Sequence, residues 1–270
     1  VGPAFPLRGG IANLNESLCK AFNERGTDSE IVSFTLQYPA FLFPGKTQFD
    51  MSGKAPENIK ISQLINSVNP VSWIKTANYI IGQKPDYVIF RYWLPFMAPA
   101  LGTIAKKLRK SGIKVIAITD NVIPHENRLG DRQLTNYFLK QCDGFIAMSK
   151  SVLKDIAGFV PNAKSVFIPH PIYDIFGEKV TRNEAAKHLG FDEKDKIILF
   201  FGFIRKYKGL DLLLESLGNS EVKSLNVKLI VAGEFYEDEQ PYMKQVSLLG
   251  IENNVVFKKD FSISKAFGFK

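Results

Sequence analysis

Three cations lie close together in the turn that follows the apolar run Ile197–Phe201. Arg205, Lys206 and Lys208 precede the segment 210–217, in which leucines recur with helical spacing. Because a helix N-terminus favours anions, cations at this position oppose the helix dipole unless an anion is bound. Free backbone N–H groups together with ammonium and guanidinium groups suit a phosphate. The sequence therefore indicates a phosphate-binding turn, and a solvated basic turn without a ligand is the alternative.

A second candidate site lies near the start of the chain, where Gly9 and Gly10 precede an amphipathic stripe over residues 11–22. Two adjacent glycines let the backbone approach a ligand closely at the start of a helix. The spacing is not the G-x-G-x-x-G of dinucleotide-binding sites, which counts against a Rossmann oxidoreductase. A tight turn that needs positive φ angles explains the pair without any ligand.

Asp120 and His125 belong to a polar loop that directly follows the strand pattern 114–119. Ligands of open α/β sheets bind outside the carboxyl ends of the strands, so position alone makes both residues candidate catalytic groups. A turn-capping role for Asp120 and an ordinary loop position for His125 are the alternatives.

Strand and helix patterns alternate along the chain, which predicts an α/β fold with parallel sheets. Apolar runs predict strands at 31–36, 87–90, 114–119, 144–148, 165–168, 197–201, 227–232 and 255–257. Stripes with helical spacing predict helices at 11–22, 71–81, 97–108, 132–141, 152–156 and 210–217. Thr181 and Glu184 form a capping box that begins a further helix. Strand 197–201 is expected to be buried on both faces, and residues 37–70 to form a long connection with little regular structure.

A proline-stiffened linker over 169–177 divides this pattern into two Rossmann-like domains, residues 1–172 and 173–270. The second domain has too few strand–helix units to close its sheet, so we expect it to be incomplete. The chain starts at Val1 in what reads as the tail of a strand and stops soon after strand 255–257. We therefore expect both ends to belong to a longer protein.

The formal net charge is +8, and residues 1–170 hold all of the excess, with 20 Lys and Arg against 12 Asp and Glu. Such a one-sided balance suggests an anionic partner such as a phosphorylated substrate, a nucleic acid or a membrane surface. Four of these cations end the helix pattern 97–108, beside aromatic residues: Lys106, Lys107, Arg109 and Lys110. They either complement the helix dipole or lie against anionic lipid.

Cys19 and Cys142 show neither paired nor metal-type spacing, which indicates a reduced, cytoplasmic protein. No apolar run reaches the ~20 residues that a membrane-spanning helix needs.

Three stretches, taken together in this order, resemble the family 4 glycosyltransferases. They are Gly9-Gly10-Ile11; the loop 120–126 with Met148-Ser149-Lys150 and Pro169-His170-Pro171; and Gly202-x-x-Arg205-x-x-Lys208-Gly209-x-Asp211 followed by Val231-Ala232-Gly233. The resemblance implies the GT-B architecture of two facing Rossmann-like domains. It also implies that a sugar moves, with retention, from a nucleotide-sugar held mainly by the second domain to an acceptor held mainly by the first.

For the donor site, the resemblance implies that Lys208 neutralises the donor diphosphate, with Arg205 as its partner. The family arginine often follows the glycine of Gly202 directly, where this chain has Phe203. Further donor-binding residues implied by the family are Gly9, Gly10, Gly233 and Glu234.

For catalysis, the resemblance places Asp120 where many members have a histidine close to the donor sugar. An ionised carboxylate accepts hydrogen bonds and cannot donate them, so His125 is expected to compensate.

The resemblance also implies the partners. A UDP- or GDP-sugar would be the donor substrate, with a glycan or polyprenyl-linked acceptor, in bacterial surface polysaccharide synthesis at the inner face of the membrane. No cofactor and no nucleic acid are expected. No metal is expected either, since no Asp-x-Asp motif lies near the candidate sites. The family's late acidic donor motif would fall beyond Lys270, so we expect residues 1–270 alone to be inactive. The alternative is a non-catalytic relative that binds a nucleotide or a sugar.

Overall fold

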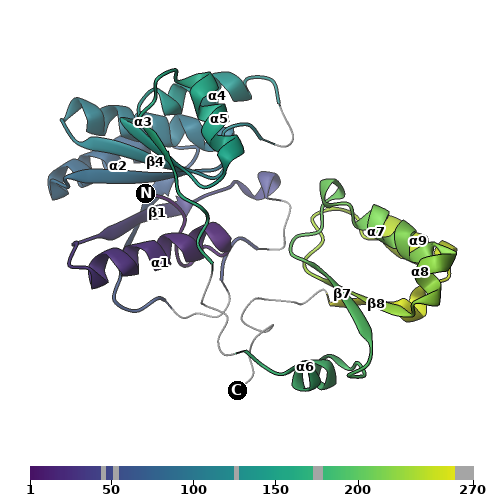
Figure 1. Ribbon diagram of the computed structural model, residues 1–270. Coiled ribbons are helices and arrows are strands. Elements are labelled where there is room, and N and C mark those ends of the chain that lie inside the picture. Colours follow the sequence, from purple (N-terminus) through teal and green to yellow (C-terminus); the bar gives the residue numbers. More distant parts are fainter. Residues whose placement is uncertain (44–46, 51–54, 125–127, 173–178, 259–270) are drawn as a thin grey trace. The chain divides into compact units, whose positions relative to one another are not determined.

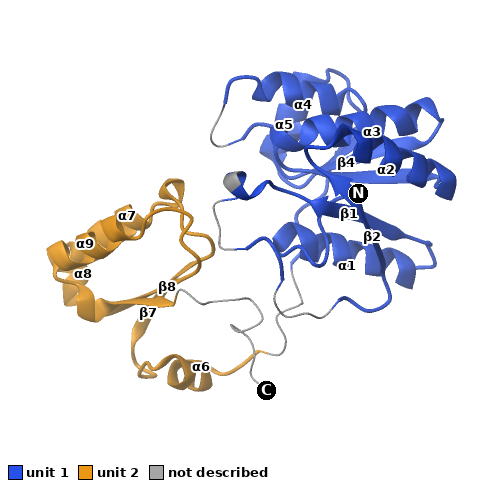
Figure 2. Ribbon diagram, turned by 180° about the vertical axis from the view of Figure 1, so that it is seen from behind, with its two compact units in different colours: residues 1–43, 47–172 blue, residues 44–46, 173–270 orange. Residues whose placement is uncertain are grey.

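The computed structural model describes residues 1–43, 47–50, 55–124, 128–172 and 179–258. The chain divides into two compact units, coloured separately in Figure 2. Unit 1 comprises residues 1–43 and 47–172, and unit 2 lies within residues 173–270. Both units are α/β with parallel sheets, which confirms the predicted fold class (Figure 1).

Unit 1 contains a two-stranded and a four-stranded parallel sheet. The first pairs β1 (Glu30–Leu36) with β2 (Lys60–Asn66), and the second has the order β3 (Tyr87–Tyr92), β4 (Lys114–Thr119), β5 (Gly144–Ala147), β6 (Ser165–Phe167). Its helices are α1 (Gly10–Glu24), α2 (Pro70–Gln83), α3 (Ala98–Lys110), α4 (Asp131–Leu139) and α5 (Lys150–Phe159).

The first two residues join the two sheets of unit 1. The amine nitrogen of Val1 donates to the carbonyl of Ile89 at 2.6 Å, and the N–H of Arg91 donates to the carbonyl of Val1 at 2.8 Å. The N–H of Gly2 donates to the carbonyl of Val32 in β1 at 3.1 Å. Residues 1 and 2 therefore lie between β1 and β3, in the position of a central strand.

Aromatic stacking dominates the core between β3 and the helices that cover it. Tyr92 and Phe138 are fully buried, and their rings stack with centroids 4.5 Å apart. The Tyr92 hydroxyl lies 3.0 Å from that of Thr135, which gives the buried oxygen a partner. Burial raises the pKa of Tyr92 far above its usual value, so this hydroxyl stays neutral. The core thus fixes the carboxyl end of β3, where Arg91 lies.

Unit 2 contains a three-stranded parallel sheet of order β7 (Lys196–Phe201), β8 (Val227–Ala232), β9 (Val255–Lys258). Its helices are α6 (Arg182–Leu189), α7 (Leu210–Gly218), α8 (Ser220–Ser224) and α9 (Gln240–Leu249). The predicted capping box of Thr181 and Glu184 is present at the start of α6. In each unit, the predicted strands and helices agree with the observed bounds to within three residues.

The expectation that residues 37–70 have little regular structure is wrong. Strand β2 lies in this segment, and a short 3-10 turn occupies Ala40–Leu42. The sequence of β2, KISQLIN, mixes polar and apolar residues, so it lacks the apolar run that marks the other strands. Its pairing with β1 supplies the backbone partners that the pattern does not reveal.

The expectation that strand 197–201 is buried on both faces is also wrong. Leu199 is 57% exposed and Phe201 is 46% exposed. In the described part of unit 2, β7 forms the edge of the sheet, and β8 is its pairing partner. Within the described residues, every helix is too short or too polar to span a bilayer.

Candidate functional site

The loops that follow β7 and β8 approach each other at two glycines. A Cβ atom built on Gly233 would lie 1.8 Å from the carbonyl oxygen of Gly202, far closer than any real contact. Gly202 and Gly233 also have φ angles of 106° and 155°, in a region that disfavours other residues. The carboxyl ends of the two strands therefore pack backbone against backbone, as only glycine at position 233 permits.

Hydrogen bonds then tie the two loops together. The N–H of Ile204 donates to the carbonyl of Glu234 at 2.9 Å, and the N–H of Tyr236 donates to the carbonyl of Ile204 at 3.1 Å. The N–H of Lys206 donates to Oε1 of Glu237 at 2.6 Å. Ile204 is fully buried at the centre of this ladder. The two segments 202–209 and 233–237 therefore pack as a single structure, which we call the paired loops.

The paired loops hold Lys208 and Arg205 in defined places. The Lys208 ammonium lies against the first glycine turn, 3.3 Å from where a Cβ on Gly202 would be. The Arg205 guanidinium lies 5.5 Å from the ring centroid of Tyr236 and 5.9 Å from that of Tyr207. Such cation–π contacts orient a guanidinium without neutralising it.

The electrostatics favour an anion at the paired loops. Partial desolvation lowers the pKa of Lys208, and the charge of Arg205 lowers this pKa further. Among the described residues, no carboxylate lies within the 4.0 Å of an ion pair from either cation. Asp211 occupies the first turn of α7 and complements its dipole, but it does not pair with these cations. A phosphate bound here would relieve the repulsion between Arg205 and Lys208.

An aromatic pair accompanies the two cations, and sequence reasoning missed it. Phe203 and Tyr236 lie with ring centroids 4.3 Å apart and an interplanar angle of 31°. The only signal in the sequence is an aromatic residue one or a few positions after each of two strand-ending glycines. This pair adds a further contact between the two loops.

Asp120, predicted as a catalytic residue, lies at the end of β4 and forms an ion pair with Arg91 of β3. Nε of Arg91 donates to Oδ2 and Nη2 donates to Oδ1, both at 2.6 Å. Arg91 is 3% exposed and Asp120 is 17% exposed, so the pair is largely desolvated. Both carboxylate oxygens are thus engaged, an arrangement that suits a positioning role at the sheet edge. Arg91 is the partner that sequence reasoning missed, although a lone cation within the apolar strand 87–92 signals a buried counter-ion.

The remaining predicted residues divide between the two units. Gly9 precedes α1 with a φ of 120°, and a Cβ there would meet nothing within 4 Å, so its backbone angle is what favours glycine. Gly10 is the first residue of α1. Unit 2 brings Arg205, Lys208, Gly233 and Glu234 together. His125 lies outside the described residues.

Family models match both units. The model described as Glycosyltransferase Family 4 matches residues 8–174, and the model described as Glycosyl transferases group 1 matches residues 181–265. No curated protein matches the chain.

Solved structures share the fold at low sequence identity. The crystal structure of Anabaena HepE with UDP and glucose matches with a TM-score of 0.66 and 15% identity. The match covers 95% of this chain and 67% of the HepE chain. A structure of the same protein with UDP has a TM-score of 0.56 and 16% identity, and covers 74% and 55%. WaaG, a glycosyltransferase involved in lipopolysaccharide biosynthesis, has a TM-score of 0.63 and 14% identity, and covers 96% and 68%.

The chain thus spans 55% to 68% of the length of these similar structures. At identities of 14% to 16%, the likeness establishes the fold and leaves the reaction to be tested. The Family 4 model, however, matches more than half of the chain, and the group 1 model matches most of the rest. The chain belongs to the family 4 glycosyltransferases and has the GT-B fold.

Proposed function

We propose that unit 2 binds the diphosphate of a nucleotide-sugar, such as a UDP- or GDP-sugar, at the paired loops. One observation carries this proposal: Arg205 and Lys208 are held at the carboxyl ends of two parallel strands, and no described carboxylate pairs with either. Ligands of open α/β sheets bind at that edge. The similar Anabaena protein was crystallised with UDP and with glucose, which supports this ligand class.

The reaction that follows is transfer of a hexose to a glycan or polyprenyl-linked acceptor, with retention. Cleavage of a nucleotide-sugar develops negative charge on the departing diphosphate. Two cations already in place would stabilise that charge without reorganising at the moment of reaction. In this proposal residues 1–172 hold the acceptor, residues 173–270 hold the donor, and neither a cofactor nor a metal takes part. Similarity to WaaG supports a role in surface polysaccharide synthesis.

The first prediction concerns Lys208. Substitution Lys208→Ala should weaken UDP binding at least about tenfold, because a hydrogen bond to a charged group contributes about 1.5–3 kcal/mol. Calorimetric titration of the intact chain with UDP, GDP and inorganic pyrophosphate measures this loss. The matched control is Lys206→Ala, which removes an equal charge two residues before Lys208. It should change the affinity by less than about threefold.

The pH dependence of the same titration separates a specific contact from general attraction. Since the pKa of Lys208 is lowered, this lysine loses its charge at a lower pH than an ordinary lysine does. Affinity for pyrophosphate should therefore fall as pH rises toward 10.5, and Lys208→Arg should retain it because guanidinium stays charged. The solvated-turn interpretation would be supported instead by two results together. Lys206→Ala and Lys208→Ala would lose equal affinity, and the wild-type chain and Lys208→Arg would bind pyrophosphate equally well at alkaline pH.

A non-catalytic nucleotide-sugar-binding protein is the second candidate function. The observation that favours it is the ion pair of Asp120 with Arg91, which occupies both oxygens of the predicted catalytic carboxylate. Nucleotide binding is common to both candidates, so turnover of a sugar donor in the full-length protein distinguishes them.

We also propose that the protein is cytoplasmic and binds the inner face of the membrane through the end of α3. Arg109 already donates to Asp143 at 3.1 Å and to the carbonyl of Lys140 at 2.9 Å. The lipid contacts would therefore come from Lys106, Lys107 and Lys110. Co-sedimentation with anionic vesicles should fall when these three lysines become glutamine, and it should be little changed by Arg109→Gln. Equal binding to neutral vesicles would rule this surface out.

A further inference from the structure

A hollow of about 330 Å³ lies in unit 1 at the carboxyl end of β4, and we call it the β4 pocket. Its volume falls within the range of about 300–1,000 Å³ that small-ligand pockets occupy. The loop after β4, the start of α4 and the end of α5 supply its lining, which includes Val122, Ile123, Pro124, Arg128, Arg132 and Phe159. Because ligands of open α/β sheets bind at the carboxyl ends of the strands, the pocket has the position of a binding site.

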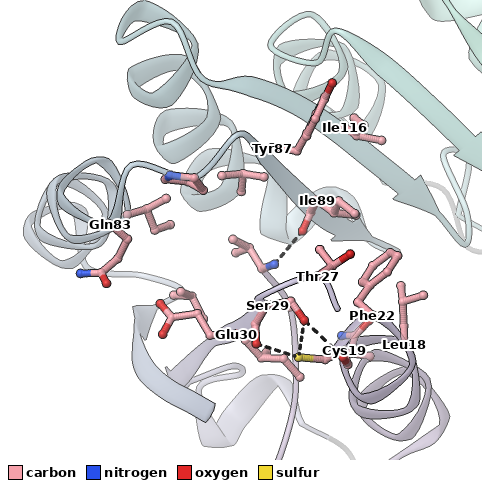
Figure 3. A pocket seen from close by; sticks show the side chains of 18 of the residues that line it. Leu18, Cys19, Phe22, Thr27, Ser29, Glu30, Gln83, Tyr87, Ile89 and Ile116 are labelled. Carbon is pink, nitrogen blue, oxygen red and sulfur yellow. Dashed lines mark hydrogen bonds between the residues drawn. The ribbon is translucent and has the colours of Figure 1, made fainter. Parts of the chain in front are cut away.

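A larger hollow of unit 1, of about 880 Å³, has a different explanation. It lies between β1 and β3, and Figure 3 shows Leu18 and Phe22 of α1 and Ile89 of β3 around it. This hollow continues the strand position that residues 1 and 2 occupy, so it belongs to the packing of the sheet. The β4 pocket has no such place in a sheet.

The inner wall of the β4 pocket is fixed to the core of unit 1. Val122 is 1% exposed, and its carbonyl accepts a hydrogen bond from Oγ1 of Thr135 at 3.3 Å. The same Thr135 hydroxyl lies 3.0 Å from that of the buried Tyr92. Phe159, on the opposite side, packs against the same core. The pocket therefore keeps its shape without a ligand.

Arg128 and Arg132 bring two positive charges to the pocket. The Arg132 guanidinium lies 5.0 Å from the ring centroid of Phe159, a contact that orients the group and leaves its charge in place. Asp131 also lines the pocket, but its Oδ2 accepts a hydrogen bond from the backbone N–H of Arg128 at 2.8 Å. In the part of the chain that the structure describes, no carboxylate forms an ion pair with either guanidinium. The pocket thus carries a net positive charge, which favours an anion.

The remainder of the lining is apolar and decides which kind of anion fits. Ile123 is 42% exposed at the pocket, and the neighbouring Leu129 is fully exposed. Among the described lining residues there is no Asn, Gln, Ser or Thr, whose neutral side chains hydrogen-bond with sugar hydroxyls. A free sugar would therefore find few partners here. A phosphate attached to an apolar chain would find two guanidinium groups and an apolar wall.

We propose that the β4 pocket binds a phosphate ester that carries an apolar chain, which is the chemistry of a polyprenyl phosphate. The guanidinium groups of Arg128 and Arg132 bind the phosphate oxygens, as paired N–H donors do. The first part of the chain lies along Ile123 and Phe159. This inference rests on the proposed function, because it selects the lipid-linked acceptor over a free glycan.

Calorimetric titration of the intact chain with geranyl phosphate and with methyl phosphate tests the assignment. Geranyl phosphate should bind at least about tenfold more tightly, because each buried CH₂ group contributes about fourfold in affinity. Arg128→Gln and Arg132→Gln should each weaken the binding of both compounds at least about threefold. Arg25→Gln is the matched control, since it removes an equal charge at the end of α1 and should change neither affinity.

A further variant separates the chain from the phosphate. Ile123→Ser should weaken geranyl phosphate at least about threefold and leave methyl phosphate unchanged. Equal affinities of the wild-type chain for the two compounds would overturn the apolar part of the assignment. A loss with Arg25→Gln as large as that with Arg132→Gln would overturn the site itself, because it would show general attraction to a basic surface.

Titration with UDP keeps this test separate from that of the proposed function. Arg128→Gln and Arg132→Gln should bind UDP as the wild-type chain does, because the paired loops lie in unit 2. A chain that binds UDP without binding geranyl phosphate would contradict this inference alone. A chain that binds geranyl phosphate without binding UDP would contradict the proposed donor site alone.

Discussion

Substitution Asp120→Leu is expected to lower the free energy of unfolding of unit 1 by about 3–5 kcal/mol, because it leaves a buried guanidinium without its counter-ion. Arg91 is 3% exposed, and its Nε and Nη2 both donate to Asp120. Chemical denaturation followed by tryptophan fluorescence measures this loss. The chain's two tryptophans, Trp73 and Trp93, both belong to unit 1, so the signal reports on that unit alone.

The double variant Arg91→Met with Asp120→Leu is the control. Removing both partners of a buried pair is often nearly neutral, so the double variant should recover most of the stability lost in the single one. This pattern would show that Asp120 acts on the fold through Arg91. If Asp120→Leu instead left stability unchanged and removed turnover in the full-length protein, the positioning role would be wrong and the predicted catalytic role would be favoured.

Substitution Gly233→Ala should destabilise unit 2 by more than about 4 kcal/mol, an exceptional effect for one methyl group. The added Cβ would lie 1.8 Å from the carbonyl oxygen of Gly202 and 2.7 Å from its carbonyl carbon. These are backbone atoms at the end of β7, so β7 and β8 must separate to make room. Amide hydrogen exchange at Leu229 and Val231 in β8 measures the loss, and UDP binding should disappear with it.

Gly190→Ala is a matched control in the same unit. Gly190 caps α6 with a φ of 81°, but a Cβ there would meet nothing within 4 Å. Its cost is therefore the backbone strain alone, about 1–2 kcal/mol. Similar losses at positions 190 and 233 would show that the close approach of the two glycine turns is not present in solution.

Much of the fold could be predicted because buried parallel strands have a plain sequence pattern. The runs Lys114–Thr119 and Val227–Ala232 are strands with these same bounds. Strand β2 could not be predicted, because its stability comes from pairing with β1 and its residues lack a consistent face. The exposure of β7 could not be predicted either, since an apolar run does not say how many neighbours a strand has in the sheet.

The candidate site was predictable only where its residues are neighbours in sequence. Arg205 and Lys208 are three positions apart, so their clustering is visible in the chain itself. Arg91 and Asp120 are separated by 29 positions, and their contact depends on the register of β3 with β4. The approach of Gly202 to Gly233 depends in the same way on the register of β7 with β8. Which residues meet across two paired strands depends on how the strands are aligned in the sheet, and no short stretch of sequence shows that alignment.

The ladder through Ile204 limits how the two segments of the proposed donor site can be exchanged between relatives. Ile204 bonds to Glu234 and to Tyr236, and Lys206 bonds to Glu237, so residues 202–209 have their geometry set by residues 233–237. A chimera that takes only residues 202–209 from a relative would carry a residue at position 204 that fits the relative's 233–237 segment and not this one. The cations at positions 205 and 208 would then be displaced. Recombination between homologues should therefore be productive only when both segments come from the same parent, with crossover points before β7 and after Glu237.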